Sequence, residues 1–358
     1  MKKLVVAFLL VFSSVQVLGQ GQRSSAQPAT KAVSSQASER LPGDTPKTTV
    51  LGNAFFAPKD WSIGVEGPAT ILEAPEGNSW IALVDVQAKG PEEALAAAWQ
   101  AYKPDAKWPI KVTNNLADED GWSRRRNYEY LTSPNEKRGV GALVCYSGSN
   151  WTVVIFDMAD AVAEKRGAQV ALVFGRLLPK GYSRESFAGK KANTLDPARL
   201  AELGRFIEGG QKVLGVPGVA LGLVQDGKVV FADGFGTKEL GRSGKPDGDT
   251  LFMVASNTKA MTTLLLAKLV DENRMTWQTP VTTLLPDFRL GDAETTRGVL
   301  VKHLICACTG MPRQDLEWIF EYGNMTPASS LALLGTMKPT SKFGELFQYS
   351  NLMAAAAE

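Results

Sequence analysis

The sequence predicts an α+β protein with more than one domain. Its 358 residues exceed the roughly 100 to 200 of a typical domain, and 44% of them are hydrophobic, which is enough to fill real cores. Two stretches with patterns of strands and helices, residues 48–182 and 195–358, flank a polar linker at 183–194. We therefore expect an N-terminal α+β sandwich, followed by a domain in which helices pack against an antiparallel sheet.

The first 19 residues have the features of a secretory signal peptide. Two lysines precede an apolar run at residues 4–18, and short side chains before Gln20 offer a cleavage site. Polar residues interrupt the run, which falls short of the ~20 apolar residues that a membrane span needs. Residues 20–47 are rich in Ser, Gln, Ala, Thr and Pro and predict a disordered linker. We expect an exported protein, periplasmic or secreted, with no membrane span after signal cleavage.

Composition argues against several classes of function. The 39 basic and 37 acidic residues nearly cancel and form no basic block, so no nucleic-acid partner is expected. Cys306 and Cys308 stand too close for an easy unstrained bridge, and the odd total of three, with Cys145, suits packed thiols better than a disulfide framework. The single histidine, His303, and the lack of a Cys-x-x-Cys motif predict no metal site and no cofactor.

Residues 48–182 show a meander pattern. Turn clusters separate the later strands, which favours antiparallel pairing. The expected elements are a strand at 79–87, a helix at 91–102, strands at 122–131, 139–146 and 151–156, and a helix at 160–178. The pattern resembles the PsbP and Mog1-like domains. Arg124, Arg125 and Arg126 would alternate between strand faces, so we interpret them as a solvated edge rather than a binding patch. No catalytic constellation stands out, and we assign this region a binding or spacer role.

The second region begins with a helix at 197–214. Strands at 216–224 and 228–236 flank Asp226-Gly227, a strong hairpin signal. A polar loop then leads to an Ala- and Leu-rich helix that starts near Ser256 and ends around residues 271–273. Prolines and glycines beyond it indicate short helices joined by loops.

Ser256 and Lys259 form a Ser-x-x-Lys motif at the start of that helix. Residues three apart share a helical face, so the Lys259 amine can reach the Ser256 hydroxyl, as a serine nucleophile without a histidine base requires. The alternative is a helix-capping serine beside a solvated lysine. Gly-x-Ser-x-Gly is absent, and a Ser-His-Asp triad would depend on His303, which we interpret as a packed or capping residue.

A second polar cluster, Gln348-Tyr349-Ser350-Asn351, follows downstream. Ser-x-x-Lys combined with Tyr-x-Asn, after a Pro-Gly-Val-Ala-Leu hairpin strand, resembles the serine β-lactamase and penicillin-binding-protein-like hydrolases, in particular their class C branch. Three further segments agree in order with that family: Thr279-Pro280-Val281, Lys302-His303-Leu304 and Thr309-Gly310-Met311-Pro312.

The resemblance implies a role for each residue of the two motifs. Ser256 would be the acylated nucleophile and Lys259 its activating or orienting partner. Tyr349 would be the general base, and Asn351 would hydrogen-bond Lys259 and the substrate amide. A free phenol has a pKa of about 10, so a nearby ammonium must favour its ionised form for it to act as a base. The implied substrates are β-lactams, D-Ala-type peptides or small esters.

Two departures from the family qualify this expectation. Cys306-Ala307-Cys308 stands where many relatives have Ser and His, which affects loop geometry more than chemistry. The family's third motif, Lys-Thr-Gly or His-x-Gly, does not follow Tyr349, so we expect a fragment truncated before it, inactive or poorly active. The alternative is a noncatalytic cell-envelope binding protein on a degenerate hydrolase scaffold. The sequence leaves the substrate, the oligomeric state and the partner of the first region open.

Overall fold

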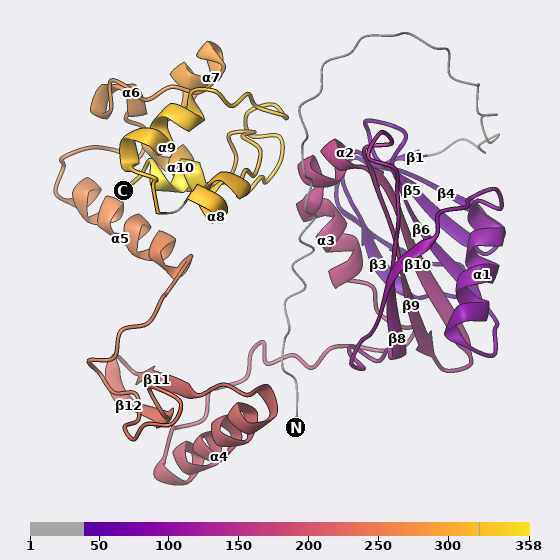
Figure 1. Ribbon diagram of the computed structural model, residues 1–358, viewed down its shortest axis with the longest axis horizontal. Helices are drawn as coiled ribbons and strands as arrows, with labels where there is room; N and C mark the ends of the chain where they lie inside the picture. Colours follow the sequence, from indigo (N-terminus) through magenta and orange to yellow (C-terminus); the bar gives the residue numbers. More distant parts are fainter. Residues whose placement is uncertain (1–38, 322) are drawn as a thin grey trace. The chain divides into compact units, whose positions relative to one another are not determined.

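The computed structural model describes residues 39–321 and 323–358 (Figure 1). The predicted signal peptide and the first part of the predicted linker lie outside the described residues. Within them, a large antiparallel sheet and many helices confirm a mixed architecture of strands and helices. No helix in the described ranges combines the length and apolar character that crossing a membrane would take.

Residues 39–182 form an eight-stranded sheet with the order β1-β4-β5-β6-β10-β9-β8-β7. Every neighbouring pair in it is antiparallel, as the turn clusters predicted. A separate hairpin pairs β2 with β3. The strands are β1 (Glu39–Arg40), β2 (Thr45–Thr48), β3 (Ala54–Ala57), β4 (Ser62–Glu66), β5 (Ala69–Glu73), β6 (Trp80–Val86), β7 (Ile110–Asn115), β8 (Ser123–Tyr130), β9 (Arg138–Ser147) and β10 (Asn150–Ala159).

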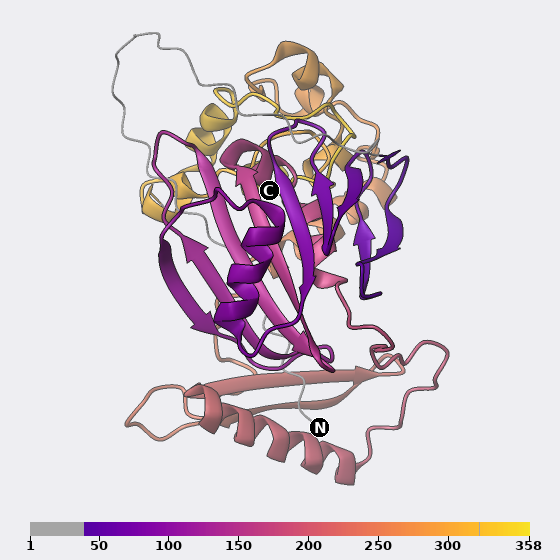
Figure 2. The ribbon, with the colours of Figure 1, turned by 90° about the vertical axis from the view of Figure 1, so that its right-hand side faces the viewer.

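Helices cover both faces of this sheet (Figures 1 and 2). Successive side chains of a strand point to opposite faces, so the central strands β6 and β10 must be apolar on both. Ala82 and Val84 pack under α1 (Pro91–Tyr102), whereas Ile81 and Leu83 belong to the core under α3 (Gly167–Gly175). This explains why β6 and β10 are almost continuously buried.

The linker predicted up to residue 47 is wrong from residue 39 onward. Strand β1 pairs with β4, and Leu41 beside it is only 1% exposed in the core with Trp61. The polar composition of this stretch gave no sign of the strand, because one buried leucine and backbone pairing with β4 are enough to hold it against the sheet. The residues form an edge of the sheet rather than a tether.

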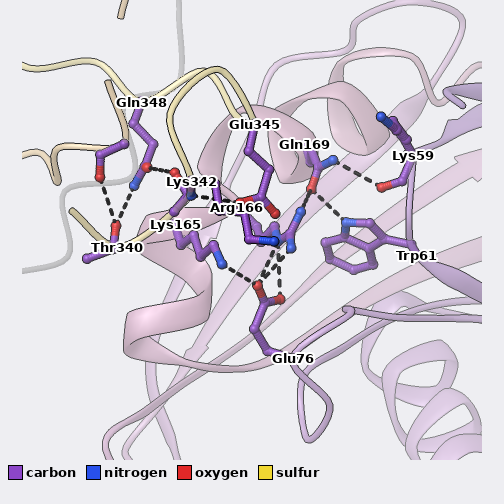
Figure 3. Close-up of polar contacts among 12 residues, drawn as sticks. Lys59, Trp61, Glu76, Lys165, Arg166, Gln169, Thr340, Lys342, Glu345 and Gln348 are labelled. Carbon is purple, nitrogen blue, oxygen red and sulfur yellow. Dashed lines mark hydrogen bonds and ion pairs between the residues drawn. The ribbon is translucent and has the colours of Figure 1, made fainter. Parts of the chain in front are cut away.

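The helix predicted at 160–178 is two helices, α2 (Asp160–Lys165) and α3. Arg166 breaks the helical geometry between them, with φ −96° and ψ 12°. Its guanidinium is buried against the Glu76 carboxylate, which also pairs with Lys165 (Figure 3). This ion pair ties the helix junction to the β5–β6 turn.

The three arginines of β8 do not form one patch. Arg124 lies over the Tyr146 and Trp151 rings, Arg125 pairs with Glu119, and Arg126 pairs with Glu92. The outermost strand is β7, not β8.

Residues 197–236 form a helix and a hairpin, as predicted. The helix α4 (Pro197–Leu214) begins after an Asp196 cap and ends at Gly215 in the left-handed conformation. Strands β11 (Gly218–Gln225) and β12 (Lys228–Gly236) pair antiparallel. Asp226 and Gly227 both have positive φ, which gives the turn the twist that a two-residue hairpin needs.

An irregular segment at residues 237–256 leads to short helices joined by loops, and residues 281–357 contain an apolar core. Val281, Phe288, Val299, Met311 and Leu352 are buried in it. The helices are α5 (Asn257–Asp271), α6 (Val281–Leu284), α7 (Ala293–Gly298), the 3₁₀ helix η1 (Val301–Leu304), α8 (Leu316–Glu321), α9 (Pro327–Leu334) and α10 (Asn351–Ala355). Leu352 and Met353 of α10 belong to this core and directly follow the Tyr349-Ser350-Asn351 motif.

Candidate active site

Ser256 stands immediately before α5, as predicted, but it does not cap the helix with its side chain. The preceding Ala255 has φ 46°, an uncommon value for a residue with a Cβ, and such backbone is concentrated at functional sites. The Ser256 hydroxyl is instead engaged by two side chains. Its Oγ lies 2.9 Å from the Tyr349 hydroxyl and accepts a hydrogen bond of 3.3 Å from Lys259 Nζ.

Lys259 connects the two sequence motifs. From one turn further along α5, its ammonium donates both to Ser256 and, at 2.7 Å, to Asn351 Oδ1. It also lies 5.0 Å from the centre of the Tyr349 ring. The structure therefore brings together all four residues predicted from the sequence.

Tyr349 is held by contacts of the loop that precedes it. The Gln348 N–H donates to the Ala307 carbonyl at 2.8 Å, and the Gln348 side chain bonds Thr340 (Figure 3) and Ser341. Gly310 lies close behind: a Cβ there would stand 2.2 Å from the Ser341 carbonyl oxygen. Only glycine fits, which explains the position of Thr-Gly in the sequence.

Electrostatics favour the ionised form of Tyr349. Partial burial of the phenol acts to raise its pKa. Hydrogen bonds with Lys259 and Ser256, together with the charges of Lys259 and Arg313, outweigh this effect. The pKa of Tyr349 is therefore lowered from its ordinary value. This is the direction that a phenolic general base requires.

Two residues at this site were not predicted from the sequence. Asp315 accepts a 2.8 Å hydrogen bond from Asn351 Nδ2 and forms an ion pair with Arg313. The Arg313 guanidinium carbon lies 5.2 Å from the centre of the Tyr349 ring. The sequence offered only a weak signal for these two residues. They are two opposite charges just after Thr-Gly-Met-Pro, in a segment without the periodic pattern of a helix or strand.

A pocket of about 160 Å³ adjoins these side chains. Lys259 and Tyr349 line it together with Ala307 and residues at the start of α10. The pocket therefore lies beside the Lys259 and Tyr349 side chains.

Cys306 and Cys308 are joined by a disulfide, so their interpretation as packed thiols is wrong. The sequence argument held that two cysteines separated by one residue are too close for an easy unstrained bridge. Here Ala307 has φ 52°, and this left-handed residue folds the chain so that the Cα atoms lie 5.2 Å apart. Cys145 remains a free, buried thiol.

His303 is a capping residue, as the sequence suggested. Its Nδ1 accepts a hydrogen bond from the Leu300 N–H at the start of η1, and its ring packs edge-on against Phe343. Burial lowers the pKa of His303, which suits this neutral acceptor role.

The site thus consists of a serine hydroxyl in contact with a lysine and a tyrosine, with an asparagine hydrogen-bonded to the lysine. A basic group beside the hydroxyl is what a serine nucleophile requires. Residues 203–357 match the Beta-lactamase family model. This part of the chain is therefore a domain of the β-lactamase family, in the superfamily of penicillin-binding-protein-like serine hydrolases.

Curated proteins also match part of the chain. It is similar to the unguisins hydrolase ungD' of Aspergillus campestris (strain IBT 28561), 32% identical over 150 residues, which are 40% of this chain and 28% of that protein. It is also similar to the protein flp of Staphylococcus aureus (strain COL), 28% identical over 139 residues, which are 38% of this chain and 28% of that protein. The chain thus spans little more than a quarter of either relative.

Among solved structures, the chain is similar to the solution structure of cyanobacterial PsbP (CyanoP) from Synechocystis sp. PCC 6803. The match covers 39% of this chain and 94% of that one, with 11% identity and a TM-score of 0.30.

Proposed function

We propose that the protein is a serine hydrolase that forms an acyl-enzyme on Ser256. The observation that carries this proposal is the position of Ser256 Oγ, within hydrogen-bond distance of both the Tyr349 hydroxyl and Lys259 Nζ. A serine hydroxyl becomes a competent nucleophile when an adjacent base removes its proton. The family suggests β-lactams, D-Ala-type peptides or small esters as substrates.

In the proposed reaction, Ser256 Oγ attacks the substrate carbonyl carbon while its proton passes to the Tyr349 phenolate. The leaving group then departs with a proton from Tyr349, and the acyl group remains on Ser256. A water molecule attacks the carbonyl carbon of this ester while Tyr349 accepts a proton from the water. Tyr349 then gives that proton to Ser256 Oγ as the acyl–Oγ bond breaks, which releases the carboxylic acid and regenerates Ser256 and the Tyr349 phenolate. Each proton thus has a defined donor and acceptor.

Lys259 and the helix start support the developing charges. The Lys259 ammonium stabilises the Tyr349 phenolate and is itself oriented by Asn351. Among the described residues, the Ser256 N–H donates no hydrogen bond to another backbone group, so it is free to bind a substrate oxyanion. One such donor contributes about a hundred- to thousandfold in rate.

We also propose that residues 39–182 form a separate domain with a binding or spacer role in an exported protein. Its two hydrophobic clusters involve only residues of this range. The described side chains there offer no counterpart of the Ser256 site.

A covalent probe tests the hydrolase proposal. We expect a fluorophosphonate or a β-lactam to add one adduct per chain, detected by intact-protein mass spectrometry and mapped to Ser256 by peptide analysis. Ser256→Ala should abolish the adduct. Ser243→Ala, which changes an exposed loop serine, should leave it unchanged. An adduct that persists in Ser256→Ala, or no adduct with either probe, contradicts the proposal.

A further inference from the structure

Arg313, Asp315, Asn351 and Lys259 form a continuous polar chain that ends at Ser256 and Tyr349. Arg313 pairs with one carboxylate oxygen of Asp315, Oδ2. The other oxygen, Oδ1, accepts from Asn351 Nδ2 at 2.8 Å, and Asn351 Oδ1 accepts from Lys259 at 2.7 Å. The two motifs of the site are thus linked to a third segment, the loop after Met311.

The two partners of Asn351 force one orientation of its amide. A carboxylate only accepts hydrogen bonds and an ammonium only donates them. The amide must therefore turn its NH₂ to Asp315 and its oxygen to Lys259. Without Asp315, nothing in these contacts would prevent a flip that sets the NH₂ against the Lys259 ammonium.

Arg313 adds a second cation beside the Tyr349 ring. Its guanidinium carbon is 5.2 Å from the ring centre, close to the 5.0 Å of Lys259 Nζ. Among the described side chains, the charged groups that face Tyr349 are Lys259 from α5 and Arg313 from the loop, and Asp315 pairs with Arg313. Two nearby cations against one paired anion favour a negative phenolic oxygen.

We propose that Arg313 and Asp315 are positioning residues of this site. Asp315 locks the Asn351 amide so that Lys259 stays directed at Ser256, and Arg313 stabilises the ionised Tyr349. The inference deepens the proposed hydrolase function and rests on it for its catalytic meaning. Its structural content is testable without any substrate.

The first test follows the ionisation of Tyr349 itself. Tyrosine labelled with ¹³C at Cζ is titrated by NMR, and Tyr349→Phe identifies the signal. In Arg313→Met, which keeps a long side chain without the charge, the Tyr349 midpoint should move up by about half a pH unit or more, discounted for the partial exposure of Arg313. Arg313→Lys should restore most of the difference. An unchanged midpoint in Arg313→Met overturns the role of Arg313.

The second test observes the Asn351 amide. Selective ¹⁵N-asparagine labelling gives its NH₂ signals, assigned by Asn351→Ala. In Asp315→Ala these signals should move toward values of a solvated amide and exchange with solvent at least tenfold faster, while the other asparagine signals stay in place. If the Asn351 signals and their exchange are unchanged, Asp315 does not hold the amide. Shifts throughout the spectrum would instead indicate misfolding, and Asp315→Asn then replaces Asp315→Ala.

Acylation then separates this inference from the proposed function. Where the probe modifies Ser256, its rate against pH should shift upward in Arg313→Met by the same amount as the Tyr349 titration. If the probe fails on the unmodified protein, the hydrolase proposal fails, and the two NMR tests still decide the roles of Arg313 and Asp315.

Discussion

At the scale of single residues, the site depends on the proton of Tyr349. Lys259 and Arg313 lower the pKa of this phenol against the effect of burial. Because a lowered pKa means that the proton leaves at lower pH, the ionised form is populated below the usual value of about 10. In the proposed reaction, the reactivity of Ser256 therefore depends on a phenol whose pKa lies below its ordinary value.

The rate of Ser256 acylation should accordingly increase with pH, with a midpoint below the ordinary phenol pKa of about 10. Single-turnover labelling across pH gives the profile. Tyr349→Phe should lower the plateau by about a hundred- to ten-thousandfold, the usual contribution of a general base, and should remove the rising limb. If the acylation rate of Tyr349→Phe still increased with pH, the general base would be another group.

At the scale of elements, the loop 306–310 sets the position of the Tyr349 segment. Ala307 and Cys308 accept hydrogen bonds from Gln348 and Gly344, and Gly310 lies against the Ser341 backbone. The left-handed residues Ala307 and Gly310 bend the loop to make these contacts possible. The loop thus holds the Tyr349 segment in place through packing and backbone hydrogen bonds.

Gly310→Ala should both destabilise the fold and impair labelling of Ser256. Its Cβ would meet the Ser341 carbonyl, in addition to the cost of about 1 to 3 kcal/mol for a side chain in the left-handed region. Gly241→Ala is the matched control, since Gly241 has nearly the same φ, 79° against 78°, but no atom within 4 Å of the added Cβ. Chemical denaturation should show a larger loss of unfolding free energy for Gly310→Ala than for Gly241→Ala. Equal losses would show that the close contact with Ser341 does not contribute to stability.

The three cysteines should differ in reactivity. Native protein should take up no iodoacetamide, because Cys306 and Cys308 are paired and burial raises the pKa of Cys145 to about 12. Mild reduction should add two labels, and unfolding a third. Peptide mapping checks the assignment, and native labelling of Cys306 or Cys308 would contradict the pairing.

At the scale of the whole molecule, residues 183–195 connect parts that have separate hydrophobic clusters. This stretch contains no helix or strand, and nearly all of it is exposed. Lys190 and Lys191 lie within it. Exposed irregular backbone of this kind is the usual site of proteolysis.

Limited trypsin digestion should therefore cut first at Lys190 or Lys191 among the described residues. The fragment that contains 39–182 should then resist further cleavage, because its core is its own. Mass spectrometry over time identifies the fragments, and a Lys190→Gln, Lys191→Gln variant controls for the site. Early cuts inside β6 or β10 would show that this region does not fold independently.

Local chemistry explains which elements could be predicted. Some signals act through near neighbours in the sequence, so the elements that they predict were expected and are present. They are Pro and Asp at the start of α4, Asp226-Gly227 in the hairpin, and the apolar runs of β6 and β10. Strands β1 to β5 and β7 were not expected. They are short or polar, and pairing with neighbours that the sequence does not identify makes them strands.

For the site, spacing at a helix start indicated Ser256 and Lys259, and the resemblance to β-lactamase-like hydrolases indicated Tyr349 and Asn351. The three-dimensional structure supplied the distances between them, added Arg313 and Asp315, and paired Cys306 with Cys308. The physical reason is that charge and hydrogen-bond geometry act through space. A loop after Met311 has no periodic pattern to mark it, and a single left-handed residue such as Ala307 redirects its neighbours without any sequence signal.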